Sequence, residues 1–96
     1  MFIISLTYHK PLEEVDAHLN AHVEFLKSNY SKGFFIASGR KTPRTGGIIL
    51  ARAANRAEIE SIIACDPFSI HDVATYEITE FTPSMTSPDL AFLTNT

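Results

Sequence analysis

Two side chains in this sequence, His22 and Asp66, are of the types that move protons near neutral pH, an imidazole and a carboxylate. His22 lies within an apolar stripe that recurs at steps of three and four residues, and at 100° per residue it falls roughly 50° from the centre of that stripe. The stripe consists of Leu12, Val15, Leu19, Val23, Leu26 and Tyr30. We therefore expect His22 to face the interior of the fold or its rim. Spacing alone leaves a second interpretation open, in which His22 is a packed histidine whose nitrogens bond to backbone groups.

Asp66 stands directly before Pro67, whose ring disfavours helical geometry in the preceding residue. Because Asp66 follows a segment with helical spacing, its carboxylate falls near the negative end of a helix dipole, where it is electrostatically unfavourable. Pairing with His22 would offset this and would fix the tautomer of the imidazole. Alternatively, Asp66 only caps the turn that follows it, as Asp-Pro sequences often do. The two side chains can meet if both helices pack on the same face of one sheet.

Two further residues are candidates for substrate binding. Ser38, followed by Gly39 at the end of an expected strand, could supply a hydroxyl group and a close backbone approach. Arg44, next to Gly46-Gly47, could hold an anionic group. Both have a simpler interpretation, because paired glycines more often only permit a turn and Ser38 lacks the sequence context of a nucleophile.

A metal site is the other chemistry that the histidines suggest. His18 and His22 are four residues apart, a spacing at which two histidines on one helix face can bind one metal ion. Leu19 stands where the general-base glutamate of the zinc-protease motif would be, and no cysteine or third histidine has suitable spacing. We therefore expect neither a metal nor another cofactor.

Hydrophobic patterning predicts four strands and two helices in the order βαββαβ. The expected strands cover residues 2–8, 34–37, 48–51 and 73–81, and the expected helices cover residues 12–30 and 55–66. This order is typical of the ferredoxin-like α+β fold, a four-stranded antiparallel sheet with two helices on one face. Residues 1–83 form the expected domain. Residues 84–96 form a C-terminal tail that we expect to dock on the domain or on a partner subunit.

The second face of this sheet needs a cover, because the expected strands at residues 34–37 and 48–51 are apolar on both sides. Packing against an identical subunit is the expected solution. The tail is the alternative cover, but it has few large apolar side chains. We therefore expect a homodimer, or a higher oligomer built from dimers.

The amino-acid composition limits which partners the protein can bind and indicates the cellular compartment in which it works. A net charge of -3 with only eight basic residues among 96 argues against nucleic acid, whose phosphates require clustered Lys and Arg. Cys65 is the sole cysteine, so no intrachain disulfide can form and a reducing compartment fits best. No apolar run approaches membrane-spanning length. We expect a cytoplasmic protein that binds neither nucleic acid nor a membrane.

Three motifs resemble those of the YCII-related domain proteins, a family of the dimeric α+β barrel superfamily, over about residues 2–83. They are His22 within Ala21-His22-Val23-Glu24-Phe25-Leu26, the pair Ser38-Gly39, and Asp66-Pro67-Phe68 before the last strand. The resemblance implies a ferredoxin-like protomer, a dimer with two sheets packed face to face, and an active site around His22 and Asp66. The chain departs from the family pattern at Leu19, where many members have arginine, and at Arg40, where proline is common.

Two functional hypotheses follow. In the first, the chain is a small cofactor-independent enzyme in which Asp66 orients His22, and His22 moves a proton on a small cyclic or carbonyl-bearing molecule in lyase or isomerase chemistry. In the second, the pocket binds or senses a metabolite without transforming it, or the dimer is only structural. An open cleft with both side chains in hydrogen-bonding range favours the enzyme, whereas sealed, dry packing favours a structural pair.

Overall fold

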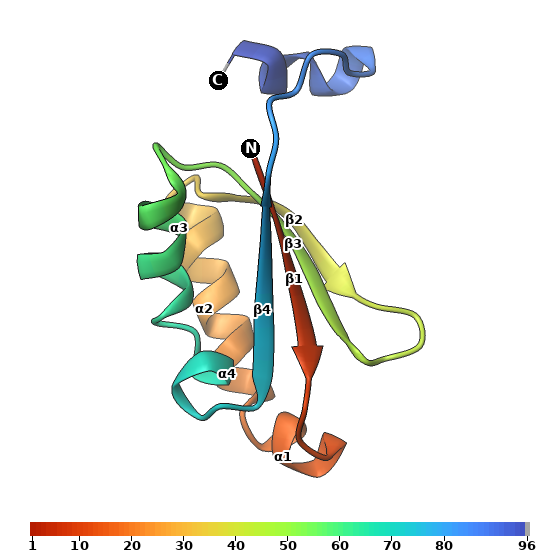
Figure 1. The fold of residues 1–96 in the computed structure, drawn as a ribbon, viewed down its shortest axis with the longest axis vertical. Coiled ribbons are helices and arrows are strands. Elements are labelled where there is room, and N and C mark those ends of the chain that lie inside the picture. Colours follow the sequence, from red (N-terminus) through yellow and green to blue (C-terminus); the bar gives the residue numbers. More distant parts are fainter. Residues whose placement is uncertain (96) are drawn as a thin grey trace.

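A single antiparallel sheet carries helices on one of its faces (Figure 1). The computed structural model describes residues 1–95, with Asn95 described by its backbone alone. The elements in chain order are β1 (Phe2–Tyr8), α1 (Leu12–Ala17), α2 (Leu19–Ser31), β2 (Phe35–Arg40), β3 (Gly46–Ala51), α3 (Arg56–Ile63), α4 (Pro67–Ile70), β4 (Ala74–Glu80) and the 3-10 helix η1 (Pro88–Asn95). The strand order is β2-β3-β1-β4, and all neighbours are antiparallel. The expected ferredoxin-like α+β fold is confirmed.

The central strand β1 shows why one sheet face is buried. Phe2, Ile4 and Leu6 alternate along it and are at most 2% exposed, whereas Ile3 on the other face is 36% exposed. Burial of each Leu, Ile or Phe side chain contributes about 1.5–3 kcal/mol to the stability of the folded state. These residues form a core with apolar side chains of the helices and the other strands, among them Val15, Phe35, Ile49, Ile59, Ile63 and Phe68. The core fixes the helices over the sheet face on which the candidate site lies.

The expected continuous helix over residues 12–30 is wrong, because the chain breaks at His18 into α1 and α2. His18 has φ -110° and ψ 4°, outside the helical range, and its ring stacks on that of His71 with centroids 3.9 Å apart. α2 runs along the sheet, whereas α1 lies at the end of the sheet (Figure 1), where Asp16 pairs with Arg44. Both contacts come from residues far along the chain, so the apolar spacing does not signal the break.

The second helical connection is also divided in two. α3 begins where the sequence predicts, because the Asn55 side chain accepts a hydrogen bond from the Glu58 N–H at 2.9 Å and the Glu58 carboxylate accepts one from the Ala54 N–H at 2.9 Å. α3 ends at Ile63, and Pro67 occupies the first turn of the short helix α4. No helix in the described part of the chain is long and apolar enough to cross a membrane.

β2 and β3 are longer than the sequence pattern predicts. β2 continues to Arg40 and β3 begins at Gly46, because Gly39 pairs with Ile48 and Arg40 pairs with Gly47 across the ladder. Glycines interpreted as turn residues therefore belong to the strands. These positions carry no side chains, and Arg40 becomes part of the sheet beside them.

The second face of the sheet is not covered by the tail, which runs past the end of the sheet (Figure 1). On that face Ile3 and Ile48 are 36% and 39% exposed. The tail instead contacts the end of the domain, where the Arg52 guanidinium lies 5.8 Å from the Phe92 ring, and Leu93 is buried. The alternative in which the tail masks the sheet face therefore does not hold for the described residues.

Candidate active site

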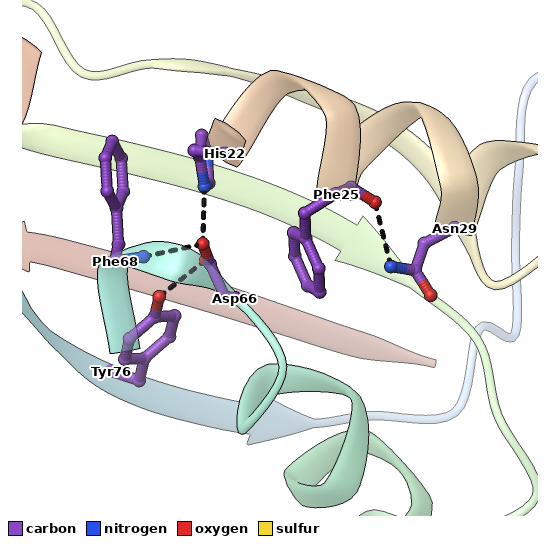
Figure 2. Close-up of polar contacts among 6 residues, drawn as sticks. All are labelled: His22, Phe25, Asn29, Asp66, Phe68 and Tyr76. Atoms are coloured by element: carbon purple, nitrogen blue, oxygen red, sulfur yellow. Dashed lines mark hydrogen bonds and ion pairs between the residues drawn. The ribbon is translucent and has the colours of Figure 1, made fainter. Parts of the chain in front are cut away.

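Asp66 is fully buried, and three donors from separate parts of the chain converge on its carboxylate (Figure 2). Oδ1 accepts hydrogen bonds from the backbone N–H of Phe68 at 3.0 Å and from His22 Nδ1 at 2.8 Å. Oδ2 accepts a hydrogen bond from the Tyr76 hydroxyl at 2.5 Å. Both interpretations of Asp66 therefore hold, because it caps the turn that begins α4 and also pairs with His22.

Three elements bring this cluster together. His22 lies on the side of α2 that faces the sheet, Asp66 immediately precedes α4, and Tyr76 lies on β4 (Figure 2). Tyr76 lies opposite Leu6 in the β1–β4 ladder, and because Leu6 is buried among the helices, Tyr76 projects from the same face. Pro67 in the first turn of α4 presets the backbone that lets Asp66 cap it. The cluster therefore lies between the helix layer and the sheet.

The contact with Asp66 leaves one nitrogen of His22 available for chemistry. A carboxylate at Nδ1 favours the tautomer that carries its proton on Nδ1 and a lone pair on Nε2. Within residues 1–95 Nε2 has no hydrogen-bond partner. The face of the ring stacks on Phe68, with centroids 4.0 Å apart and planes 8° apart. Two independent contacts thus fix the orientation of the imidazole, as a general base requires.

Tyr76 holds the second carboxylate oxygen of Asp66 in place. Burial, followed by the hydrogen bond to Asp66, raises the pKa of Tyr76 well above its usual range. The phenol therefore keeps its proton at neutral pH and donates a hydrogen bond to Asp66. Because Oδ2 is engaged by Tyr76, the carboxylate can meet His22 only through Oδ1, which restricts its rotation.

His22 also lines a pocket of about 170 Å³ between α2 and the strands β1, β2 and β3. Its apolar wall includes Leu6, Leu19, Val23, Leu26, Ile49 and Phe68, and its polar side chains besides His22 are Tyr8, Ser38 and Arg40. An apolar cavity of about 150 Å³ is large enough for benzene. The pocket therefore accommodates a molecule with one ring, next to the imidazole. This is an open cleft and not a sealed packing of His22 against Asp66.

The two predicted binding residues lie in different surroundings. Ser38 lines the pocket, and its Oγ forms a hydrogen bond of 2.6 Å with Tyr30 Oη. Arg44 lies outside the lining and its guanidinium pairs with Asp16. The hydrogen bond between these two lowers the pKa of Asp16 and raises that of Arg44. The expected role of Arg44 in binding an anion stays a prediction.

Sequence reasoning missed two residues of the site, Tyr76 and Arg40. Strand alternation places Tyr76 and Ile78 on one face of the last strand, but no sequence signal joins Tyr76 to Asp66. Arg40 could have been found only by extending the second strand through Gly39, since its orientation follows from the pairing with β3.

The histidine pair suggested by its spacing is separated in the structure. His18 stacks on His71, whereas His22 pairs with Asp66. In residues 1–95, no group of three or more His, Cys, Asp or Glu side chains is arranged to hold a metal ion.

The fold and the buried pair define a small ferredoxin-like α+β protein with a candidate acid/base site. The profile of the YCII-related domain family matches residues 1–82, and the chain belongs to this family. Its structure is similar to that of the 5-chloro-2-hydroxyhydroquinone dehydrochlorinase of Burkholderia phenoliruptrix AC1100 in complex with 2,5-dihydroxybenzoquinone. The TM-score is 0.71 at 17% sequence identity, over 85% of this chain and 94% of the other, and the likeness is one of fold. A comparison with curated proteins gives no match.

Proposed function

We propose that this chain is a small cofactor-independent enzyme that uses His22 and Asp66 for general acid/base chemistry of the lyase or isomerase type. One observation carries the proposal: Nδ1 of His22 is held at 2.8 Å by a fully buried carboxylate while the same ring lines a pocket. A packed histidine also needs hydrogen-bond partners, but packing alone does not require that its ring line an adjacent cavity.

The reaction follows from the free nitrogen. Nε2 of His22 accepts a proton from a C–H or O–H group of the substrate, and Asp66 stabilises the imidazolium that forms. The electron pair of the broken bond moves into the substrate. In a lyase it expels a leaving group on the adjacent carbon, and in an isomerase the imidazolium returns the proton to another atom. Both outcomes balance without an added oxidant, reductant or metal.

The size of the pocket supports a substrate with a single ring. The similar dehydrochlorinase is named for a chlorinated hydroxyhydroquinone and was solved with a dihydroxybenzoquinone, both molecules of one ring. A ring that carries hydroxyl or carbonyl groups also stabilises the negative charge left after proton removal. We propose that Ser38, which lines the pocket, contacts the substrate, and that Arg44 has a secondary role.

We also propose that the protein works as a homodimer in the cytoplasm. The support for the dimer is the sheet face that the tail leaves open, with Ile3 and Ile48 exposed on it. The support for the location is the sole cysteine, Cys65, which is a free thiol.

The proposal is tested by proton exchange with solvent, which reports a general base before the product is known. The protein is incubated in D₂O with hydroxylated quinones and their chlorinated analogues, and deuterium incorporation and chloride release are followed. We expect wild type to accelerate one of these, and His22→Gln to lose about a hundred- to ten-thousand-fold of that rate. His9→Gln is the matched control, because His9 pairs with Asp72 outside the pocket. Full activity in His22→Gln contradicts the proposal, and ligand binding without exchange supports the binding module instead.

A further inference from the structure

We propose that Arg40 is the specificity-determining residue of this pocket and that it selects a single-ring substrate bearing an oxyanion, such as a carboxylate or an ionised ring hydroxyl. This inference rests on the proposed function, because it names the substrate class of the same site. Arg40 on β2 and His22 on α2 both line the pocket.

The strand register orients Arg40 towards the pocket. Arg40 pairs with Gly47 in the β2–β3 ladder, and Gly47 pairs with Leu6 in the β1–β3 ladder. Residues opposite one another in antiparallel strands project from the same face. Because Leu6 is buried under the helices, Arg40 projects from the helix-covered face, on which His22 also lies.

The space between Arg40 and the helix is kept clear by Gly47, which lines the pocket and pairs with Leu6 on the helix-covered face. A Cβ atom at the preceding residue, Gly46, would lie 1.8 Å from the carbonyl oxygen of Leu6. Only glycine therefore fits where β3 approaches β1 this closely. A Cβ at Gly47 would lie 3.1 Å from the carbonyl oxygen of Gly39. Gly47 thus removes the side chain that would otherwise fill this part of the pocket.

Arg40 is the one arginine whose guanidinium has no partner within residues 1–95. The others are engaged: Arg44 with Asp16, Arg56 with Glu60 and with the carbonyl of Ile78, and Arg52 with the carbonyl of Gly33 and the Phe92 ring. The pocket lining contains no Asp or Glu side chain that could neutralise it. In a chain of net charge -3, this pocket is therefore locally positive.

The planar guanidinium group of Arg40 can donate two parallel hydrogen bonds to a planar oxyanion such as a carboxylate. The mainly apolar wall of the pocket would contact the ring of the same molecule. A carboxylate or ring oxyanion directed at Arg40 would leave the ring in the apolar part of the pocket, which the imidazole of His22 also lines. Arg40 thus sets orientation as well as affinity, whereas the guanidinium of Arg44 pairs with Asp16 outside the pocket lining.

The test measures the binding of two probes of the same shape, benzoate and its neutral analogue benzamide, by calorimetry and by amide chemical-shift mapping. The variant is Arg40→Gln. Its matched control is Lys41→Gln, which removes the same charge from the next residue. Lys41 lies on the opposite sheet face, where its Nζ donates to Thr7 Oγ1 at 3.1 Å.

We expect wild type to bind benzoate about tenfold or more tightly than benzamide, with shifts at His22 and Ser38. Arg40→Gln should lose this preference and Lys41→Gln should keep it. Equal affinity for the two probes, an unchanged preference in Arg40→Gln, an equal loss in Lys41→Gln, or no benzoate binding at millimolar concentration would each overturn the inference.

The failure of this inference is distinguishable from the failure of the proposed function. His22→Gln should retain the preference for benzoate while it loses proton exchange. If His22→Gln keeps full exchange, the acid/base proposal fails and the anion site stands. If exchange depends on His22 but Arg40→Gln binds benzoate like wild type, the enzyme stands and the assignment of Arg40 fails.

Discussion

Nδ1 of His22 and Oδ1 of Asp66 lie 2.8 Å apart, although the two residues are 44 positions apart in the chain. The carboxylate also caps α4 and accepts a hydrogen bond from the Tyr76 hydroxyl. Its position is therefore fixed by the fold before any substrate binds. Preorganisation of this kind lets a carboxylate hold one imidazole tautomer in one orientation.

Asp66→Asn tests the carboxylate. The amide would present a donor to side chains that already donate, so we expect the exchange rate to fall by about a hundred- to ten-thousand-fold. The free energy of unfolding should drop by about 1–3 kcal/mol, measured with urea, because buried hydrogen bonds are lost. Asp72→Asn is the control: Asp72 is exposed and has φ 54°, which asparagine tolerates. Equal rates in the two variants would exclude a special role for Asp66.

Tyr76→Phe tests the third member of the cluster through alkaline stability. The pKa of Tyr76 is raised in the folded protein, so above the usual tyrosine pKa of about 10 the unfolded chain releases a proton that the folded chain keeps. The contribution of protonated Tyr76 to the free energy of unfolding is fully present below that pH. It is lost as the pH rises further, towards the raised pKa of the folded protein. Wild type should therefore lose stability more steeply above this pH than Tyr76→Phe, as urea unfolding at several pH values would show. Parallel curves would contradict the buried, protonated phenol.

Gly46→Ala tests the close approach of β3 to β1 beside the pocket. A Cβ atom there would collide with the backbone of Leu6, so we expect a loss of about 1–3 kcal/mol in unfolding free energy. Gly39→Ala is the matched control in the neighbouring strand, since a Cβ at Gly39 has no atom within 4 Å among those described. Thermal unfolding should show a lowered midpoint for Gly46→Ala alone. A Gly46→Ala protein as stable as wild type would refute this strand geometry.

Asp16→Asn tests the ion pair that ties α1 to the β2–β3 connection. The Arg44 hydrogen bond lowers the pKa of Asp16, so the pair stabilises the fold at neutral pH and is lost as the pH falls through the lowered pKa. The variant should be slightly less stable than wild type at pH 7, and the two should converge at acid pH and at high salt. A difference that persists unchanged in acid would show that the effect is not electrostatic.

Much of the architecture could be predicted because it follows from local patterns. The alternation in β1 and the Asn55 cap with Glu58 three residues later both reflect contacts close in sequence. The pairing of His22 with Asp66 was predicted from a shared sheet face. The expected unfavourable position of the carboxylate was wrong, because α3 ends at Ile63 and Asp66 caps the N-terminus of α4.

What sequence reasoning missed depends on contacts between distant segments. The break at His18 is stabilised by stacking on His71, and Tyr76 meets Asp66 only because the β1–β4 register turns it towards the helices. Arg44 was predicted to bind an anionic group because two glycines, Gly46 and Gly47, lie close behind it in the sequence. The β2–β3 register instead places Arg40 in the pocket, and a register cannot be read from the residues of one strand.

The tautomer of His22 tests its role as the base most directly, and it is measured by long-range ¹H–¹⁵N NMR at neutral pH with His22→Gln for assignment. We expect a proton on Nδ1, an unprotonated Nε2 whose chemical shift changes on adding a single-ring ligand, and loss of the fixed tautomer in Asp66→Asn. A ring that carries its proton on Nε2 and responds to no ligand would contradict this role, because that nitrogen could not act as the base.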